Sequence, residues 1–432
     1  NCDRPGALQR GERLEMAAIL ICGGGNAAQV TVTLFGSRYK VFGLSLYADE
    51  AERWDKSWKE ARQMTCELKQ PDSAKSKVVT AQPDLITNDP SVVKNCSIVL
   101  FTVPSSFHQQ YFEALAPHVQ EGTIFVIMPA RSGADYLFKN TFGAKAPKLG
   151  LVAFETLPWA CRITEFGKAT MVLGTKETIG AAIIPPAGKA KQEVILTLQG
   201  MLGIQPQIID VPNVMTISLG NPGAVIHPGV TYGRYANWDG QPFKEKPLFY
   251  HGVDTFTADV LTGISEEIQL IAKKLKSSKR GFDTSLVKTI YEWYMESYSN
   301  QIKDCSTLEA AMKTNEAYEG LTHPMTKAES GGEVVWVPDF NFRYLSEDVP
   351  TGLCFMKGVA ELLGLKTPVI DKTLAWAQTK ISKEYLLPNG KLEGKDLKET
   401  RAPQAFGVKT KRELLKSLQV PSSTTTCYCS MM

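Results

Sequence analysis

One histidine of this chain lies in a stretch that favours acid–base chemistry. His227 falls within SLGNPGAVIHPGVTYGRY, residues 218–235, together with Asn221 and several glycines. Imidazole can accept or donate a proton near neutral pH, which suits a general acid or base. Because Pro228 disfavours helix at the residue before it, we predict a helix break at His227 that lets the side chain face a cleft. A histidine that only caps or packs fits the same sequence.

The stretch NFRYLSEDVP, residues 341–350, supplies charged side chains that could work with that histidine. Arg343 and Asp348 lie five residues apart, and Glu347 is next to Asp348. An arginine can hold a carboxylate with two hydrogen bonds. An aspartate can fix the tautomer of a histidine and stabilise its charged form. The alternative is a surface ion pair between Arg343 and Asp348, which is common at such spacings.

A glycine-rich loop near the start of the chain predicts a nucleotide site. In AAILICGGGNAAQV, the residues Gly23, Gly24, Gly25, Asn26, Ala27 and Ala28 contain the pattern G-x-G-x-x-G/A between an apolar strand and a helix. The first glycine allows the tight turn, the second lets the backbone approach a pyrophosphate, and the small last residue lets helix and strand pack closely. Backbone N–H groups at the helix start would hold the phosphates. We predict that all six residues bind the cofactor; the alternative is a purely structural turn.

Recognition of the cofactor's ribose requires an acid near the end of the second strand. The strand predicted over residues 40–48 is followed by Asp49, which arrives late but is the first acid available. Arg53 lies one turn beyond it. We predict that Asp49 binds the cofactor and that NAD is favoured over NADP, although the glycine motif by itself leaves the two open.

Alternating strands and helices must position these residues. Apolar runs separated by helical patterns predict a doubly wound α/β domain with a parallel sheet, and long helical patterns dominate from about residue 211. A ligand is expected at the carboxyl ends of the strands, in a crevice between two domains. The predicted strands are 17–22, 40–48, 97–104, 123–129 and 150–158. The predicted segments of the chain are a leader at 1–15, a dinucleotide-binding Rossmann domain at 16–210, a mostly α-helical substrate domain at 211–415 and a tail at 416–432.

Composition narrows the classes of protein that this chain could belong to. Its 432 residues are 43% hydrophobic and 22% charged, as in an ordinary globular protein. The net charge of +3 is too small to indicate a nucleic-acid or membrane partner. Nine scattered cysteines do not form a disulfide framework, and the one C-x-C pair, Cys427 and Cys429, cannot fill a zinc site. With no apolar run of membrane-spanning length and no signal core before Met16, we predict a cytoplasmic protein without a metal.

Six stretches in order resemble the opine dehydrogenases of marine invertebrates, the group of octopine, tauropine, strombine and alanopine dehydrogenases. They run from ICGGGNAA and LYADEAERW, through FETLPWACRI and HPGVTYGRYANWDG, to PLFYHGVD and RYLSEDVPTG, and the similarity spans about residues 16–415. The resemblance implies a Rossmann domain followed by a helical domain, often as a monomer. It implies NADH-dependent condensation of pyruvate with an amino acid to an N-(1-carboxyethyl) amino acid, which regenerates NAD in anaerobic glycolysis. By motif it implies a catalytic pair, His227 and Asp348, with Arg343 binding a substrate carboxylate.

The choice of amino acid depends on residues beside the expected cleft. Arg131, in MPARSGADY, stands where octopine-type members resemble PSQAG, with a glutamine. A cation there disfavours arginine and favours taurine, glycine, alanine or β-alanine, unless Arg131 faces solvent or the cofactor phosphates. Thr156 and Asn221 are further candidates for substrate contact, whereas Cys161 is expected to be a packed thiol. A simple hydroxy-acid dehydrogenase and a non-catalytic NAD-binding protein are the competing interpretations.

Overall fold

A computed structural model describes residues 17–69 and 76–418 of the chain. The predicted leader at 1–15 lies outside the described residues, as does nearly all of the predicted tail at 416–432. The chain divides into two compact units, residues 1–211 and 212–432, which we describe separately.

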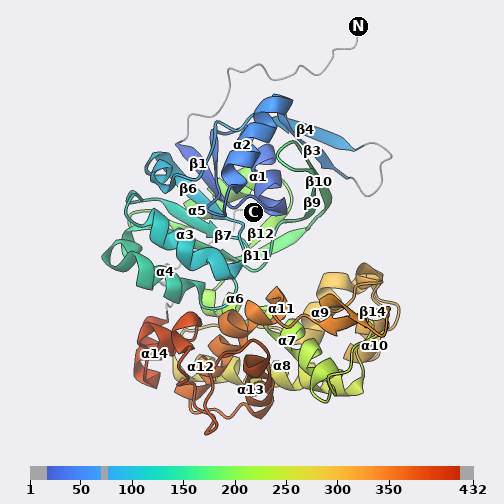
Figure 1. The fold of residues 1–432 in the computed structure, drawn as a ribbon. Helices are drawn as coiled ribbons and strands as arrows, with labels where there is room; N and C mark the ends of the chain where they lie inside the picture. Colours follow the sequence, from blue (N-terminus) through green and yellow to red (C-terminus); the bar gives the residue numbers. More distant parts are fainter. Residues whose placement is uncertain (1–16, 70–75, 419–432) are drawn as a thin grey trace, which may run out of the picture. The chain divides into compact units, whose positions relative to one another are not determined.

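The first unit is built on an eight-stranded sheet that confirms the predicted α/β class (Figure 1). All neighbouring strands in it run parallel except β8 and β11. Strand β1 is buried along its whole length, as its unbroken apolar sequence requires in a parallel sheet covered on both faces. The strand order is β12 (Gln207–Val211), β11 (Thr178–Ile184), β8 (Gly150–Phe154), β7 (Ile124–Ile127), β6 (Cys96–Phe101), β1 (Ala18–Cys22), β2 (Val41–Leu44) and β5 (Leu85–Thr87).

Helices connect these strands, and a second sheet that the sequence did not predict packs on the first helix. Strand β9 alternates buried and exposed residues over Trp159–Arg162 and lies against α1 through its buried side. The helices of the first unit are α1 (Asn26–Gly36), α2 (Glu50–Ala61), α3 (His108–Leu115), α4 (Ala134–Phe142) and α5 (Lys191–Leu202). The strand order of the second sheet is β4 (Lys77–Ala81), β3 (Met64–Leu68), β10 (Ala169–Thr175) and β9 (Trp159–Glu165).

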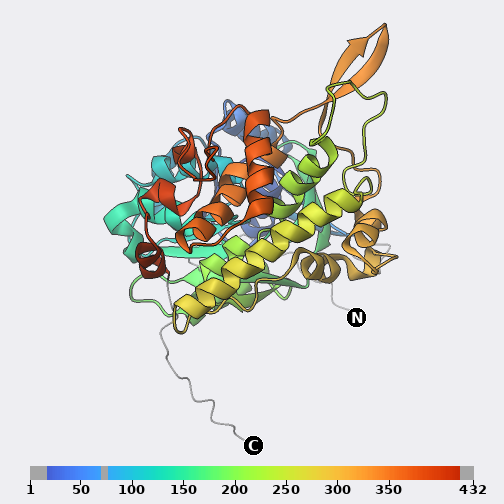
Figure 2. The same cartoon turned by 90° about the horizontal axis from the view of Figure 1, so that it is seen from below.

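The second unit is mostly helical, as predicted, with one two-stranded hairpin. Figure 2 shows the long helix α8 along its length and the hairpin reaching away from the helices. A π-helical segment, η6 (Val349–Leu353), leads into α12. The elements are α6 (Val214–Leu219), α7 (Pro222–Tyr235), α8 (Thr255–Ser278), α9 (Ile290–Tyr298), α10 (Leu308–Lys313), β13 (Met325–Ser330), β14 (Glu333–Pro338), α11 (Arg343–Ser346), α12 (Cys354–Leu362), α13 (Pro368–Lys380) and α14 (Lys411–Ser417).

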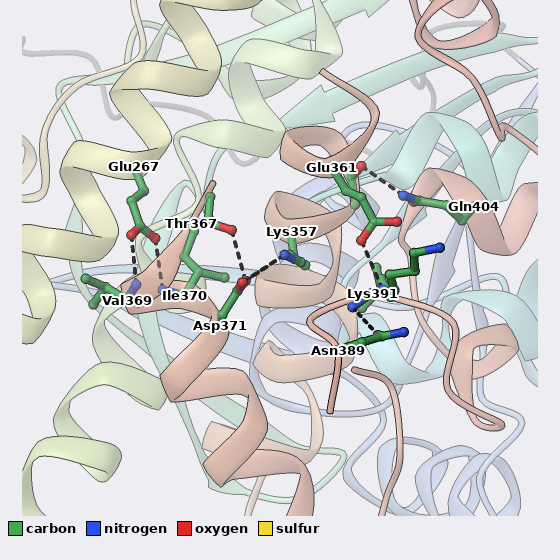
Figure 3. A network of polar contacts seen from close by, with 12 residues as sticks. Glu267, Lys357, Glu361, Thr367, Val369, Ile370, Asp371, Asn389, Lys391 and Gln404 are labelled. Carbon is green, nitrogen blue, oxygen red and sulfur yellow. Dashed lines mark hydrogen bonds and ion pairs between the residues drawn. The ribbon is translucent and has the colours of Figure 1, made fainter. Parts of the chain in front are cut away.

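A buried polar network ties three of these helices together (Figure 3). Glu267 of α8 accepts hydrogen bonds of 2.8 and 2.9 Å from the first backbone N–H groups of α13, and so caps that helix from outside. Lys357 of α12 is 5% exposed and pairs with Asp371 of α13 at 2.8 Å. Because each buried charge has a partner, the network fixes α12, and with it the segment η6 that precedes α12.

Candidate active site

The glycine loop has the geometry that a phosphate-binding turn requires. Gly23 has φ of +112°, and a Cβ there would lie 2.8 Å from a methyl carbon of Val103 and 3.7 Å from the Cβ of Ala28. A Cβ on Gly25 would meet no heavy atom within 4 Å, so a ligand can reach its backbone. Gly25 is also the N-cap of α1, and no side chain caps that helix start. The N–H groups at the start of α1 therefore face an open approach that suits a pyrophosphate.

Two side chains of α1 hold this loop against the second sheet. The side-chain oxygen of Asn26 accepts a 2.8 Å hydrogen bond from the backbone N–H of Ile163. Gln29 is fully buried; its amide nitrogen donates to the carbonyl of Gly24 and its oxygen accepts from the N–H of Gly167, both at 2.9 Å. Asn26, predicted as a cofactor ligand, thus also has a structural contact. Gln29 was missed, although a glutamine among apolar residues of a buried helix signals a specific hydrogen bond.

Glu50, rather than Asp49, is the carboxylate next to the glycine loop. Asp49 is the N-cap of α2, and its exposed side chain pairs with Arg53 at 3.0 Å. Glu50 accepts a 2.5 Å hydrogen bond from the hydroxyl of Ser45, directly after strand β2. A Cβ on Gly24 would lie 2.2 Å from a carboxylate oxygen of Glu50, so Glu50 keeps this position beside the loop only while residue 24 is a glycine. Glu50 is therefore a second candidate for the ribose of the cofactor, and the role predicted for Asp49 stays a prediction.

Arg131 and Thr156 lie at the same edge of the main sheet as the glycine loop. Arg131 follows β7 and Thr156 follows β8, and these neighbouring strands are parallel to β1 through β6. Both side chains are half-buried, and Arg131 has a left-handed φ of +60°. The carboxyl edge of a doubly wound sheet is where ligands bind. Cys161, by contrast, is buried, and burial raises the pKa of its thiol to about 11, which fits a packed, unreactive side chain.

The predicted helix break at His227 is wrong. Helix α7 runs from Pro222 to Tyr235 and continues through Pro228. A proline inside a helix removes one backbone hydrogen bond, but close packing against α8 holds α7 over the turns that follow the ring. A Cβ on Gly229 would lie 2.6 Å from Leu261, and one on Gly233 would lie 2.4 Å from Thr257.

His227 and Asp348 form the central contact of the second unit. The Nδ1 atom of His227 lies 2.7 Å from an Asp348 carboxylate oxygen, and the side chains are 16% and 0% exposed. Asp348 precedes η6, whose Gly352 packs so closely on α7 that a Cβ would lie 2.5 Å from that of Ala224. This approach brings together two residues that are 121 positions apart. The carboxylate can hold the tautomer with a proton on Nδ1 and stabilise a charged imidazole.

Arg343 and Asn221 lie near this pair but have other partners. Arg343 pairs with Glu347 at 2.9 Å, so the alternative of an Arg343–Asp348 surface pair does not form. Arg343 is half-exposed, which leaves part of its guanidinium accessible to a ligand. Asn221 is the buried N-cap of α7, where its oxygen accepts a 3.2 Å hydrogen bond from Gly223. Capping gives a structural reason for an asparagine at this position, and its predicted contact with substrate stays a prediction.

The part of the chain that the structure describes has neither a metal-binding cluster nor a membrane-spanning helix. Within residues 17–69 and 76–418 no group of three or more His, Cys, Asp or Glu side chains could hold a metal ion. Within the same ranges no helix is long and apolar enough to cross a membrane.

Comparison with known proteins identifies the family of this site. A family model described as NAD/NADP octopine/nopaline dehydrogenase, alpha-helical domain, matches residues 210–381. The chain is 40% identical to the octopine dehydrogenase of Pecten maximus over 395 residues, which cover 91% of this chain and 97% of the relative. The chain belongs to the opine dehydrogenase family.

Other relatives agree with this membership. The tauropine dehydrogenase of Arabella iricolor is 39% identical over 93% of this chain and 100% of the relative. A solved octopine dehydrogenase structure with NADH and L-arginine superposes with a TM-score of 0.86 at 39% identity, covering 93% of this chain and 98% of that one. The predicted family, fold class and NAD cofactor are therefore confirmed, and the protein is an NAD-dependent oxidoreductase acting on CH–NH bonds.

Proposed function

We propose that this enzyme condenses pyruvate with a small or anionic amino acid and reduces the product with NADH to an N-(1-carboxyethyl) amino acid. The observation that carries the proposal is the 2.7 Å contact between His227 and the fully buried Asp348. The relatives support pyruvate and an amine as the two kinds of substrate, since the solved octopine dehydrogenase structures include complexes with pyruvate, with L-arginine and with agmatine. The small or anionic character of the amine rests on Arg131 alone. A hydroxy-acid dehydrogenase would need only the keto acid.

We assign the cofactor to the first unit. The loop Gly23–Ala28 would hold the pyrophosphate on the open N-terminus of α1, with Ala27 and Ala28 packing the helix on the sheet. Glu50 would accept hydrogen bonds from the adenosine ribose, because its carboxylate lies beside Gly24 whereas Asp49 points to Arg53. NADH, when bound, supplies the hydride that reduces the imine.

His227 acts as the general acid and base in this proposal. The substrate amine attacks the carbonyl carbon of pyruvate, and protonated His227 donates from Nε2 to the carbonyl oxygen, which becomes a hydroxyl. His227 then takes a proton from the attacking nitrogen and returns it to the hydroxyl, which leaves as water and gives the protonated imine. Asp348 accepts a hydrogen bond from Nδ1–H, which keeps the ring in one tautomer and stabilises its charge. Arg343 binds a substrate carboxylate through the part of its guanidinium that Glu347 leaves accessible, and so positions the reacting carbon.

Arg131 is the basis for proposing a small or anionic amino acid. Its guanidinium carries a fixed charge at the carboxyl edge of the sheet, next to the strand that ends before Thr156. Two like charges about 6 Å apart repel by roughly 3 kcal/mol at an effective dielectric constant near 20, so a cationic substrate is disfavoured there. The sulfonate of taurine or the carboxylate of β-alanine would instead be attracted. Thr156 offers a hydroxyl for a further hydrogen bond.

Substrate-dependent NADH consumption tests the proposal. The assay supplies pyruvate alone, amine alone, and both together, with taurine, glycine, alanine, β-alanine and arginine as the amines. We expect consumption only with both substrates and a higher kcat/KM for taurine or β-alanine than for arginine. Arg131→Gln should reverse that preference by about 10-fold or more. Consumption with pyruvate alone would contradict the reaction, and an unchanged preference in Arg131→Gln would contradict the role of Arg131.

Two further proposals concern the whole protein. We propose a cytoplasmic location, in keeping with a reaction that regenerates NAD for glycolysis; cell fractionation tests it, and recovery with membranes would contradict it. We propose a monomer, and light scattering during size-exclusion chromatography should give the chain mass of 47.5 kDa. A mass twice as large would contradict that proposal.

A further inference from the structure

The imidazole ring of His227 is restrained on three sides. Asp348 holds Nδ1 at 2.7 Å. The ring of Tyr344 stacks on one face, with centroids 3.9 Å apart and planes inclined by only 11°. The ring of Phe249 lies 6.1 Å away at an angle of 59°. Among the described residues, Nε2 of His227 has no hydrogen-bond partner, so this nitrogen is the one available to a substrate.

Tyr344 is itself held in place by two other aromatic rings. Phe249 contacts it at a centroid distance of 4.8 Å, and Phe342 meets it edge-on at 5.1 Å and 83°. Burial raises the pKa of the Tyr344 phenol, so the ring next to His227 remains neutral at physiological pH. Tyr344 lies four residues before Asp348, so one short segment supplies both the stacked ring and the hydrogen-bonded carboxylate.

The stack adds a restraint that the hydrogen bond does not provide. The torsion that turns an imidazole about its Cβ–Cγ bond is broad, and a carboxylate accepts hydrogen bonds over a wide range of directions. The Asp348 contact therefore leaves the ring plane free to rock, which would swing Nε2 sideways. A parallel ring at van der Waals distance blocks that motion. The face of an aromatic ring also attracts a cation, so the contact persists when His227 is protonated.

We propose that Tyr344 is a positioning residue for catalysis: its ring stacks on His227 and keeps Nε2 directed toward the reacting carbonyl. This inference rests on the proposed role of His227 as the general acid and base. It requires the aromatic ring of residue 344 but not its hydroxyl, because the described residues include no hydrogen-bond partner for that hydroxyl.

Three variants of the full chain separate the ring from other properties of the residue. Tyr344→Phe keeps the ring, Tyr344→Leu removes it, and Tyr232→Leu is the matched control. Tyr232 is another half-buried tyrosine of the same unit, and it packs on Trp376 at 5.5 Å. With NADH, pyruvate and amine near saturation, we expect Tyr344→Leu to lose about 10-fold in kcat with an unchanged KM for NADH, and Tyr344→Phe and Tyr232→Leu to stay within about twofold of wild type.

Proton NMR of histidine-labelled enzyme with bound NADH reports the stack directly. A stacked aromatic ring shifts the His227 ring protons upfield, and loss of a resonance in His227→Ala assigns the signal. We expect the upfield shift in wild type and Tyr344→Phe and its loss in Tyr344→Leu. A Tyr344→Leu enzyme with full kcat, or with reduced kcat but an unchanged His227 resonance, would overturn the proposal.

The same set of variants separates this inference from the proposed function. If His227→Ala keeps near-wild-type kcat, the assignment of His227 as acid and base is wrong, whatever Tyr344 does. If His227→Ala is inactive and Tyr344→Leu is fully active, the proposed function stands and the positioning role of Tyr344 is wrong.

Discussion

Replacement of Asp348 by asparagine is the most informative perturbation of the candidate site. The substitution keeps the size and shape of a side chain that is fully buried, so no cavity forms. It removes the negative charge that lies 2.7 Å from Nδ1 of His227. The asparagine oxygen can still accept a hydrogen bond, but it stabilises a protonated imidazole far less than a carboxylate does.

The size of the effect follows from that geometry. A hydrogen bond to a charged group contributes about 1.5–3 kcal/mol, and the contact here is short and shielded from water. Since each 1.36 kcal/mol corresponds to a factor of ten, we expect Asp348→Asn to lower kcat by roughly 10- to 100-fold. The KM for NADH should not change, because in our assignment the cofactor is bound by residues of the first unit.

The assay is NADH oxidation with pyruvate and the preferred amine at saturation. Asp259→Asn is the control, since Asp259 is exposed on α8 and its replacement changes the charge by the same amount. Thermal unfolding of both variants checks that the fold is intact. If Asp348→Asn keeps kcat within about twofold of wild type while folding normally, the carboxylate does not support His227 and the mechanism is wrong.

Three more predictions test the cofactor site, the packing and the pH dependence. Glu50→Gln should raise the KM for NADH by about 10-fold while Asp49→Asn should not; the opposite result would restore Asp49 as the ribose ligand. Gly352→Ala should lower both Tm and kcat, because the new Cβ would lie 2.5 Å from the Cβ of Ala224 on α7. The control Gly200→Ala has open space around its Cβ and should change neither quantity. Equal effects of the two substitutions would contradict the close approach of Gly352 to α7. Burial lowers the pKa of His323 from 6.5 to about 3, so its contribution to stability is complete above pH 6.5 and is lost as the pH falls toward 3. Between about pH 7 and pH 5, the free energy of unfolding measured in urea should fall by about 2 kcal/mol more in wild type than in His323→Phe. An equal fall in the two proteins would refute this.

The sequence predicted the first unit well because its signals are local. An apolar run followed by Gly23–Ala28 and a helical pattern specifies a strand, a tight turn and a helix within one stretch of chain. The position of Glu50 beside the loop could not be predicted, because it depends on where β2 ends and on the Ser45 hydroxyl that holds Glu50. The second sheet could not be predicted as one sheet, because its two local pairs, β3 with β4 and β9 with β10, are joined by residues about 100 positions apart, such as Thr65 and Ala169.

Residue types offered His227 and Asp348 as one possible pair, and the family resemblance was needed to join them. His227 and Asp348 are 121 residues apart, and no periodicity along the chain links them. Local propensity even gave a wrong answer at Pro228, because packing of Gly229 and Gly233 on α8 outweighs the hydrogen bond that the proline removes. The Tyr344 stack is equally invisible in the sequence, since it needs α7 and α11 to be brought into contact first.

The central claim is that this enzyme joins pyruvate and an amino acid and oxidises NADH in the same reaction. Quantifying NADH consumed and N-(1-carboxyethyl) amino acid formed in the same reaction, by absorbance and mass spectrometry, tests it directly. We expect one product molecule for each NADH, only when both substrates are present, and almost none with His227→Ala. Lactate formed from pyruvate without an amine, or undiminished product with His227→Ala, would contradict the account.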